Sequence, residues 1–293
     1  MRITLPSFAK INWTLRVAGK RADGFHEVCT VMQTVSLHDT LTFEPANEIS
    51  LTSDDPQIPI DRRNLILQAA QLLCEATGQQ HGAAIHLQKR IPSPGGLAGG
   101  SSNAAAALVG LTRLWKLSKG LELNGLAARL GSDVPFFLTG GTALATGRGE
   151  EIEPIAEIEA RHMLIVTPPV RVLTAEAYSS LTLAALTSED RESILTVCRN
   201  SARSLDPLDP ELTNDFERSV FAAYPEVERV KKTLLELGAA NAAMSGSGAS
   251  VFAVFDKKEA RQAAEKALDS ESTWRKFAVS TISRAEYREA LGL

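Results

Sequence analysis

The sequence has few cysteines and no long apolar run. Its three cysteines, Cys29, Cys74 and Cys198, are scattered, and none belongs to a Cys-x-x-Cys pair. This usage is typical of a protein that stays reduced, and it argues against a disulfide or zinc scaffold. No apolar stretch is long enough to span a membrane, and the first residues lack the apolar segment of a signal peptide. We therefore expect a cytoplasmic protein.

An excess of positive charge is also missing. The chain carries 31 Lys and Arg against 35 Asp and Glu, for a net charge of −4. Proteins that bind nucleic acids in general are basic, so we expect no nucleic-acid partner. An anionic ligand would have to be held by local positive groups. The length of 293 residues is sufficient for two domains, which we place at 1–155 and 156–293.

Several common motifs are absent. No Gly-Lys-Ser/Thr follows a glycine-rich loop, which excludes a Walker A site. Leu97 stands where a dinucleotide-binding Gly-x-Gly-x-x-Gly fingerprint would need its second glycine. No Gly-x-Ser-x-Gly elbow is present, so a serine hydrolase is unfavoured. The five histidines show no metal-ligand spacing, and we predict no dedicated metal site.

A glycine-rich loop, residues 92–103, stands at the centre of the chain. It follows a predicted strand over 83–91 and precedes a predicted helix from about Ala104 to Trp115. Glycines let a backbone approach a phosphate, and the first N–H groups of a helix lack partners inside it. Ser101, Ser102 and Asn103 are residue types that cap a helix start. The pattern indicates an anion site, although a tight connection that needs small residues remains an alternative.

Two further stretches carry polar residues in informative places. Residues 9–18 alternate, with Lys10 and Asn12 on the face opposite the apolar side chains. This predicts a half-buried strand, for which a solvated polar face is the ordinary interpretation. Asp133 precedes an apolar segment, where it could cap a helix. A second glycine-serine loop, residues 245–248, lies between two predicted strands.

The order and spacing of three stretches, residues 6–12, 92–103 and 243–249, resemble the three motifs of the GHMP small-molecule kinases. This resemblance covers the whole chain. A turn at Gly19–His26 and the segment Leu130–Phe137 are most similar to the branch that acts on a CDP-linked methylerythritol. The family resemblance implies an α+β, two-domain fold. Its N-terminal α+β domain would resemble ribosomal protein S5, its C-terminal α+β domain would be ferredoxin-like, and the active site would lie between them.

The resemblance also implies a reaction. ATP would phosphorylate the tertiary 2-hydroxyl of the methylerythritol moiety, giving ADP and the 2-phosphate, in the non-mevalonate route to isoprenoid precursors. Asp133 matches the catalytic aspartate and Lys10 the catalytic lysine. A carboxylate can accept the hydroxyl proton, and a lysine can neutralise the transferring group. Asn12, on the same strand face as Lys10, would position the acceptor alcohol or Asp133.

The remaining site residues follow from the same resemblance. Phe25 and His26 would recognise cytosine by stacking and hydrogen bonding, and Tyr178 would close the other side of the base. Gly246, Ser247 and Gly248 would contact the substrate. ATP would bind to the loop residues Pro92, Ser93, Pro94, Gly95, Gly96, Leu97, Ala98, Gly99, Gly100, Ser101 and Ser102.

Two features depart from the family's usual loop, because Pro94 and Ala98 stand where glycine is common. Proline removes a backbone donor, so we expect the N–H groups from Gly95 to Ser102 to hold the phosphates. Mg²⁺ would arrive with ATP and be held by phosphates and water, with Ser102 as a further ligand. We expect a monomer or weak homodimer. The alternatives are a GHMP kinase for mevalonate or homoserine, and a catalytically silent nucleotide-binding module.

Overall fold

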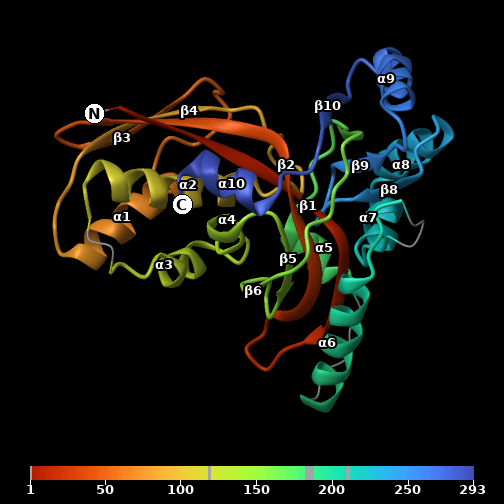
Figure 1. The fold of residues 1–293 in the computed structure, drawn as a ribbon, viewed down its shortest axis with the longest axis horizontal. Coiled ribbons are helices and arrows are strands. Elements are labelled where there is room, and N and C mark those ends of the chain that lie inside the picture. The colour runs from red at the N-terminus through yellow and green to blue at the C-terminus, as the bar shows by residue number, and fades with distance from the viewer. Residues whose placement is uncertain (1, 118–119, 182–187, 209–211) are drawn as a thin grey trace.

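The protein folds into two β-sheets with associated helices (Figure 1). The computed structural model describes residues 2–117, 120–181, 188–208 and 212–293. The first half contains β1 (Ile3–Lys20), β2 (His26–Pro45), β3 (Ile49–Ser53), α1 (Leu65–Thr77), β4 (Ala83–Gln88), α2 (Gly99–Leu114), α3 (Leu123–Leu130), α4 (Phe136–Thr139), β5 (Thr142–Thr146) and β6 (Glu151–Pro154). The second contains β7 (Met163–Thr167), α5 (Thr174–Ser179), α6 (Ser188–Arg203), α7 (Glu217–Ala223), α8 (Pro225–Glu236), β8 (Asn241–Met244), β9 (Val251–Val254), α9 (Lys258–Ala267), β10 (Arg275–Val279) and α10 (Arg284–Leu291).

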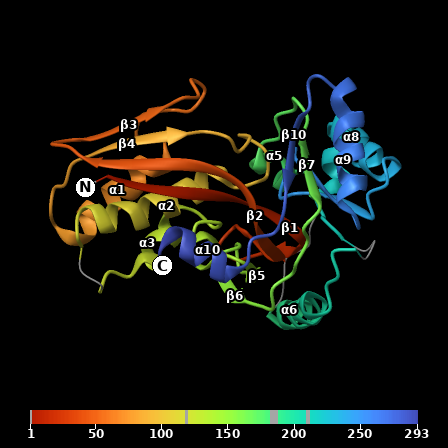
Figure 2. The same cartoon turned by 45° about the horizontal axis from the view of Figure 1, so that its top comes forward.

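The first sheet is built around the long hairpin of β1 and β2. Its strand order is β3-β4-β2-β5-β6, with β1 paired along β2, and only β3 and β4 are paired in parallel. Helices α1, α2 and α3 lie on one side of this sheet (Figure 2). The small residues of α2 allow a close approach, since a Cβ at Gly110 would lie 2.5 Å from the Phe43 ring. This packing forms the core of the first half.

The second sheet has the order β10-β7-β9-β8. With helices between β7 and β8 and between β9 and β10, the chain runs β-α-β-β-α-β in the spatial order 4-1-3-2, which is ferredoxin-like. Helices α8 and α9 cover the face of the sheet that points away from the first half (Figures 1 and 2). The predicted α+β class and the ferredoxin-like second half are confirmed.

The two halves meet across an apolar layer. Trp13 of β1 is completely buried, and its ring contacts Phe252 of β9 edge-on at 5.4 Å between centroids. This contact covers the apolar face of β1. On the opposite face Lys10 and Asn12 are 4% and 2% exposed, and there the Lys10 amide donates to Leu97 O at 3.1 Å while Gly246 lies beside Lys10 Nζ. The interpretation of their face as solvated is wrong, because loops from distant parts of the sequence cover it.

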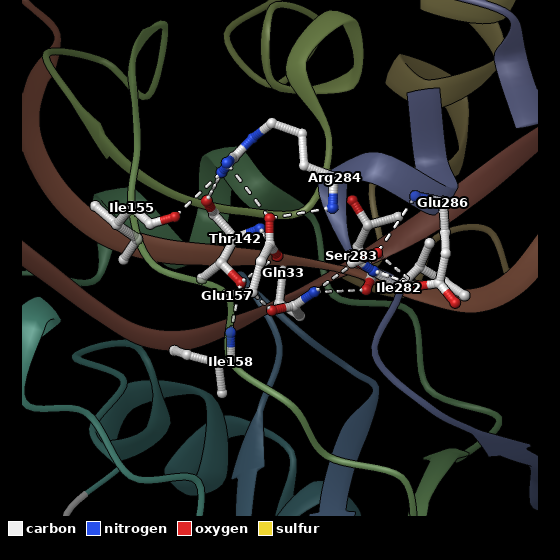
Figure 3. Close-up of polar contacts among 10 residues, drawn as sticks. Gln33, Thr142, Ile155, Glu157, Ile158, Ile282, Ser283, Arg284 and Glu286 are labelled. Carbon is white, nitrogen blue, oxygen red and sulfur yellow. Dashed lines mark hydrogen bonds and ion pairs between the residues drawn. The ribbon is translucent and has the colours of Figure 1, made fainter. Parts of the chain in front are cut away.

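After β10 the chain returns to the first half. The Ile282 amide donates to the Thr34 carbonyl at 2.9 Å, and the Tyr287 hydroxyl of α10 donates to the Phe137 carbonyl at 2.5 Å. Figure 3 shows Arg284 and Glu157 converging on Thr142. The Arg284 guanidinium lies 3.4 Å from the Glu157 carboxylate, which accepts from the Thr142 amide at 3.1 Å. The proposed division at residue 155 stays a prediction.

Several elements differ from those expected. Helix α2 begins at Gly99 and not near Ala104, so the end of the glycine-rich loop forms its first turn. The residue before it is Ala98, at φ 52°, and no side chain caps the helix, so the expected capping by residues 101–103 is wrong. The apolar content of residues 28–35 and 37–43 predicts two strands, and the structure joins them in one strand, β2. The sequence over 174–186 also predicts a helix. Helix α5 covers its first part, and residues 182–187 lie outside the described residues.

None of the helices that the structure describes is both long and apolar enough to cross a membrane.

Candidate active site

A cavity of about 310 Å³ opens between the two halves, bordered by the glycine-rich loop. Strands β1 and β2, the loop before α2, the turn before α4, helix α5 and the loop between β8 and β9 all contribute to it. Its lining includes Lys10, Asn12, Thr30, Pro92, Ser93, Pro94, Gly95, Gly96, Ala98, Gly99, Gly100, Ser101, Asp133, Arg148, Thr174, Tyr178, Gly246, Ser247 and Gly248. Residues far apart in sequence thus share one hollow.

Lys10, Asn12 and Asp133 form a polar cluster at this cavity. The Lys10 ammonium donates to Asn12 Oδ1 at 2.6 Å and lies 3.6 Å from Asp133 Oδ2. The Lys10 side chain is 5% exposed, whereas that of Asp133 is 30% exposed. The buried lysine therefore has its partners fixed, while the carboxylate keeps a face open to the cavity.

Asp133 does not cap a helix. The residue that precedes α4 is Pro135, and no side-chain hydrogen bond caps that helix. The carboxylate is placed instead by the turn before α4, beside Gly149, where a Cβ would lie 3.9 Å from Asp133 Oδ1. The alternative structural role considered for Asp133 is therefore excluded.

The glycine-rich loop rests on the second half of the chain. Gly95 O accepts from the Ser250 amide at 3.2 Å, and Gly96 O accepts from Ser245 Oγ at 3.0 Å. Gly96 adopts φ +71°, and a Cβ there would lie 2.0 Å from Ser245 O. On its other side the Lys10 amide donates to Leu97 O at 3.1 Å. The loop is thereby fixed next to Lys10, and glycine is required at position 96.

Asp39 of β2 is completely buried and holds the start of the loop. Its Oδ1 accepts from the amides of Arg90 and Ile91 at 2.7 and 2.8 Å. Its Oδ2 accepts from Lys89 Nζ at 2.6 Å. Burial lowers the pKa of the Lys89 ammonium, and the nearby Asp39 charge opposes that effect. Asp39 thus anchors the segment that leads from β4 into the loop.

The same carboxylate reaches the other end of the loop. Asn103 Nδ2 donates to Asp39 Oδ2 at 3.0 Å and to Ser7 Oγ at 2.9 Å. Ser7 Oγ in turn donates to Ser102 Oγ at 2.7 Å. Both ends of the loop are therefore tied to β1 and β2 by buried hydrogen bonds.

Aromatic side chains lie at the rim. Phe25 is 53% exposed, and the Arg148 guanidinium lies over its ring at 4.8 Å. The rings of His26 and Tyr178 are stacked, with centroids 5.0 Å apart and an interplanar angle of 23°. Tyr178 also contacts the edge of Phe216 at 4.8 Å. Burial raises the pKa of Tyr178 to about 12, and the Asp133 charge contributes.

The second glycine-serine loop faces the first. Gly246 adopts φ +56°, and a Cβ there would lie 3.3 Å from Lys10 Nζ. Asn214 Nδ2 holds this loop by donating to Gly246 O at 2.8 Å. The hydroxyls of Ser247 and Thr174 lie 2.9 Å apart. The loop thus closes the cavity over the buried lysine.

Family models match both halves of the chain. The GHMP kinases N terminal domain matches residues 64–141, and the GHMP kinases C terminal model matches residues 182–272. The chain is 43% identical to the 4-diphosphocytidyl-2-C-methyl-D-erythritol kinase of Pelotomaculum thermopropionicum, over 91% of this chain and 94% of the relative. The chain belongs to the GHMP kinase family, in the branch of the 4-diphosphocytidyl-2-C-methyl-D-erythritol kinases.

Solved structures agree with this membership. A crystal structure of 4-(cytidine 5'-diphospho)-2C-methyl-D-erythritol kinase superimposes with a TM-score of 0.77 at 33% identity, covering 95% of this chain and 99% of that one. Mevalonate kinase of L. major, solved with R-mevalonate, superimposes with a TM-score of 0.69 at 17% identity, covering 96% of each chain. The second likeness concerns the fold alone.

Most residues expected at the site of this GHMP kinase border the cavity, and four do not. Leu97 is buried in the core and Ser102 is buried beneath the loop, while Phe25 and His26 lie outside the lining. Sequence reasoning missed three polar side chains of the lining: Thr30, Arg148 and Thr174. The Gly-Arg-Gly turn is a usable sequence signal for Arg148, whereas a threonine in a strand or before a helix carries none.

In the part of the chain that the structure describes, no group of three or more His, Cys, Asp or Glu side chains is placed to hold a metal ion.

Proposed function

We propose that this chain transfers the γ-phosphoryl group of ATP to the 2-hydroxyl of 4-diphosphocytidyl-2-C-methyl-D-erythritol, producing ADP and the 2-phosphate. The observation that carries the proposal is the cluster of Lys10, Asn12 and Asp133 beside a glycine-rich helix start. The names of the relatives and of the solved structure supply the substrate.

Each member of the cluster has a role that its geometry supports. Asp133, with its partly open carboxylate, accepts the proton of the acceptor hydroxyl. Lys10 lies beside that carboxylate and neutralises charge on the transferring phosphoryl group. Asn12 holds the Lys10 ammonium in place through its 2.6 Å hydrogen bond. Phosphoryl transfer depends mainly on such positioning and charge stabilisation.

The ATP phosphates bind at the start of α2. Residues 99–101 lie in its first turn, where backbone N–H groups and the helix dipole favour an anion. The Ser102 amide, which was expected to take part, donates instead to Ala98 O at 2.9 Å. Ala98 takes the left-handed φ of 52° that precedes this turn, so the departure from glycine is accommodated there. Mg²⁺ enters with ATP and is bound mainly by phosphate and water. Ser102, which is buried and does not border the cavity, is not a ligand in this proposal.

The cytidine end of the substrate binds near Phe25, His26 and Tyr178. In the structure, the His26 ring stacks on the Tyr178 ring. A cytosine stacked on Tyr178 takes the place of this imidazole, which then becomes free to hydrogen-bond the edge of the base. Phe25 is exposed and available for the opposite face of the base.

Two alternatives make different predictions. A kinase for mevalonate or homoserine has no use for the aromatic group at the rim, because its substrate carries no nucleobase. A silent nucleotide-binding module has no use for a carboxylate beside Lys10. The three buried, unpaired cysteines fit a reducing compartment such as the cytoplasm.

The test is an assay of ADP release with the CDP-linked substrate, mevalonate and homoserine offered in parallel. We expect turnover with the CDP-linked substrate. ADP release with mevalonate or homoserine alone contradicts the proposal. Asp133→Asn serves as the matched variant, and we expect its kcat to fall by about 10²–10⁴-fold, the range for a lost acid-base group, with ATP affinity retained. Unchanged turnover would remove Asp133 from the role of base.

A further inference from the structure

The Thr30 hydroxyl lies directly behind the catalytic cluster. Thr30 is on β2, opposite Leu15 of β1, and is 2% exposed. Its Oγ1 donates to Thr14 O at 2.6 Å and accepts from Asn12 Nδ2 at 2.7 Å. A hydroxyl has one proton, and here the backbone carbonyl takes it. Thr30 therefore presents a lone pair, and not a proton, to Asn12.

This arrangement sets the orientation of the Asn12 amide. Because the NH₂ group faces the Thr30 lone pair, the amide oxygen faces Lys10 Nζ, at 2.6 Å. The reversed amide would turn its NH₂ toward the ammonium, so that two donors would face each other without an acceptor between them. Thr30 thus decides which end of Asn12 meets Lys10.

The consequence reaches Asp133. Lys10 Nζ is held by Asn12 Oδ1 on one side and lies 3.6 Å from Asp133 Oδ2 on the other. We propose that Thr30 is a positioning residue for phosphoryl transfer, acting through Asn12 to fix the Lys10 ammonium beside Asp133. This inference rests on the proposed function of the site.

Two variants separate the effect of the Thr30 hydroxyl from the effect of the side-chain shape. Thr30→Val keeps the branched shape and loses both hydrogen bonds, and Thr30→Ser keeps the hydroxyl. We expect kcat of Thr30→Val to fall by about 10–100-fold, since a small misplacement of catalytic groups can cost about 10²-fold. The KM values for both substrates should stay within about twofold, because the lost bonds are made within the protein. Thr30→Ser should recover most of the wild-type kcat.

A double-mutant cycle with Asn12→Ala tests the route of the effect. If Thr30 acts through Asn12, Thr30→Val should change kcat little in the Asn12→Ala background. Additive losses would overturn the inference, as would a Thr30→Val kcat equal to that of the wild type. Should Thr30→Val fold poorly, as judged by thermal unfolding, Thr30→Ala takes its place in the same cycle.

A second measurement needs no turnover. Buried and donating to Thr30 Oγ1, the Asn12 side-chain NH₂ should exchange slowly with solvent in the NMR spectrum of the unliganded wild type, and faster in Thr30→Val. Equal exchange in both proteins contradicts the inference. A wild type that releases no ADP with the CDP-linked substrate contradicts the proposed function instead, and the exchange measurement still tests Thr30.

Discussion

His26 and Tyr178 stack on each other although one begins β2 in the first half and the other lies in α5 of the second, with ring centroids 5.0 Å apart. The aromatic rim is therefore a contact between the two halves of the chain. Binding of a nucleobase against Tyr178 exchanges one stacked ring for another of similar size. The net affinity gained from this stack is then smaller than stacking on a bare ring would give.

Replacing Tyr178 tests its part in base recognition. Stacking of a base on an aromatic ring contributes about 1–3 kcal/mol, so the loss of the ring should raise KM for the cytidyl substrate by about 5–100-fold. We expect Tyr178→Ala to fall at the lower end of this range, because His26 competes for the ring, and to leave KM for ATP unchanged. Tyr178→Phe retains the ring and should resemble the wild type. Equal effects of Tyr178→Ala on both KM values would contradict a contact with the base.

Tyr178 should also affect stability in alkali. The pKa of a tyrosine is ordinarily about 10, and burial raises that of Tyr178 to about 12. Between these values the unfolded chain loses the proton while the folded chain keeps it, so the free energy of unfolding falls as the pH rises. Tyr178→Phe has no such proton and should lose less stability over this interval. Urea denaturation of both proteins at a series of pH values checks this, and parallel curves would contradict the raised pKa.

Gly96 and Gly100 form a matched pair within the loop. A Cβ at Gly96 would collide with Ser245 O at 2.0 Å, whereas at Gly100 the nearest atom, Leu65 Cδ1, is 3.9 Å away. Gly96→Ala should displace the loop from the second half, raising KM for ATP by about tenfold or more, the size of a lost contact worth about 1.4 kcal/mol. Gly100→Ala, inside a helix, should keep or raise the melting temperature. A normal melting temperature and KM for Gly96→Ala would refute the tight contact.

Breaking the buried pair of Asp39 and Lys89 should be costly. Both side chains are 4% exposed or less, and removal of one charge leaves the other buried without its partner. We expect Asp39→Asn to lower the free energy of unfolding by about 3–5 kcal/mol, measured by urea denaturation. Asp61→Asn, which breaks an exposed pair with Arg63, serves as control and should have little effect. Similar losses for the two variants would mean that the buried network contributes no special stability.

The sequence predicted the architecture better than its details. The helical spacing of apolar residues over 64–77 predicts a helix that ends at Gly78, and α1 confirms it, with Asn64 as a cap that the spacing did not identify. The motifs pointed to Lys10, Asn12 and Asp133, but periodicity alone assigned Lys10 to a solvated face. That error arose because the glycine-rich loop and the loop between β8 and β9 cover this face of β1, and such long-range contacts leave no mark on the local pattern of a strand.

Other features had no sequence signal at all. Helix α2 begins at Gly99, directly after Ala98, which adopts a left-handed φ. Alanine rarely adopts this conformation, so the sequence did not predict a helix start there. The role of Thr30 depends on which of its two hydrogen-bond partners, Thr14 O or Asn12 Nδ2, receives the hydroxyl proton. Asp39 lies far in sequence from the loop that it holds, and one aspartate in a strand is indistinguishable from a surface residue until the strand pairs and the loop is folded over it.

Helix α10 contacts the first residues of the chain, since Tyr287 packs against Phe8 with ring centroids 5.6 Å apart. Synthesis runs from the N-terminus toward the C-terminus, so Phe8 is made well before Tyr287. The first half can collapse early around its own helices, yet its surface near Phe8 stays without this partner until α10 has been made. The kinase fold is thus completed only after both halves have been synthesised.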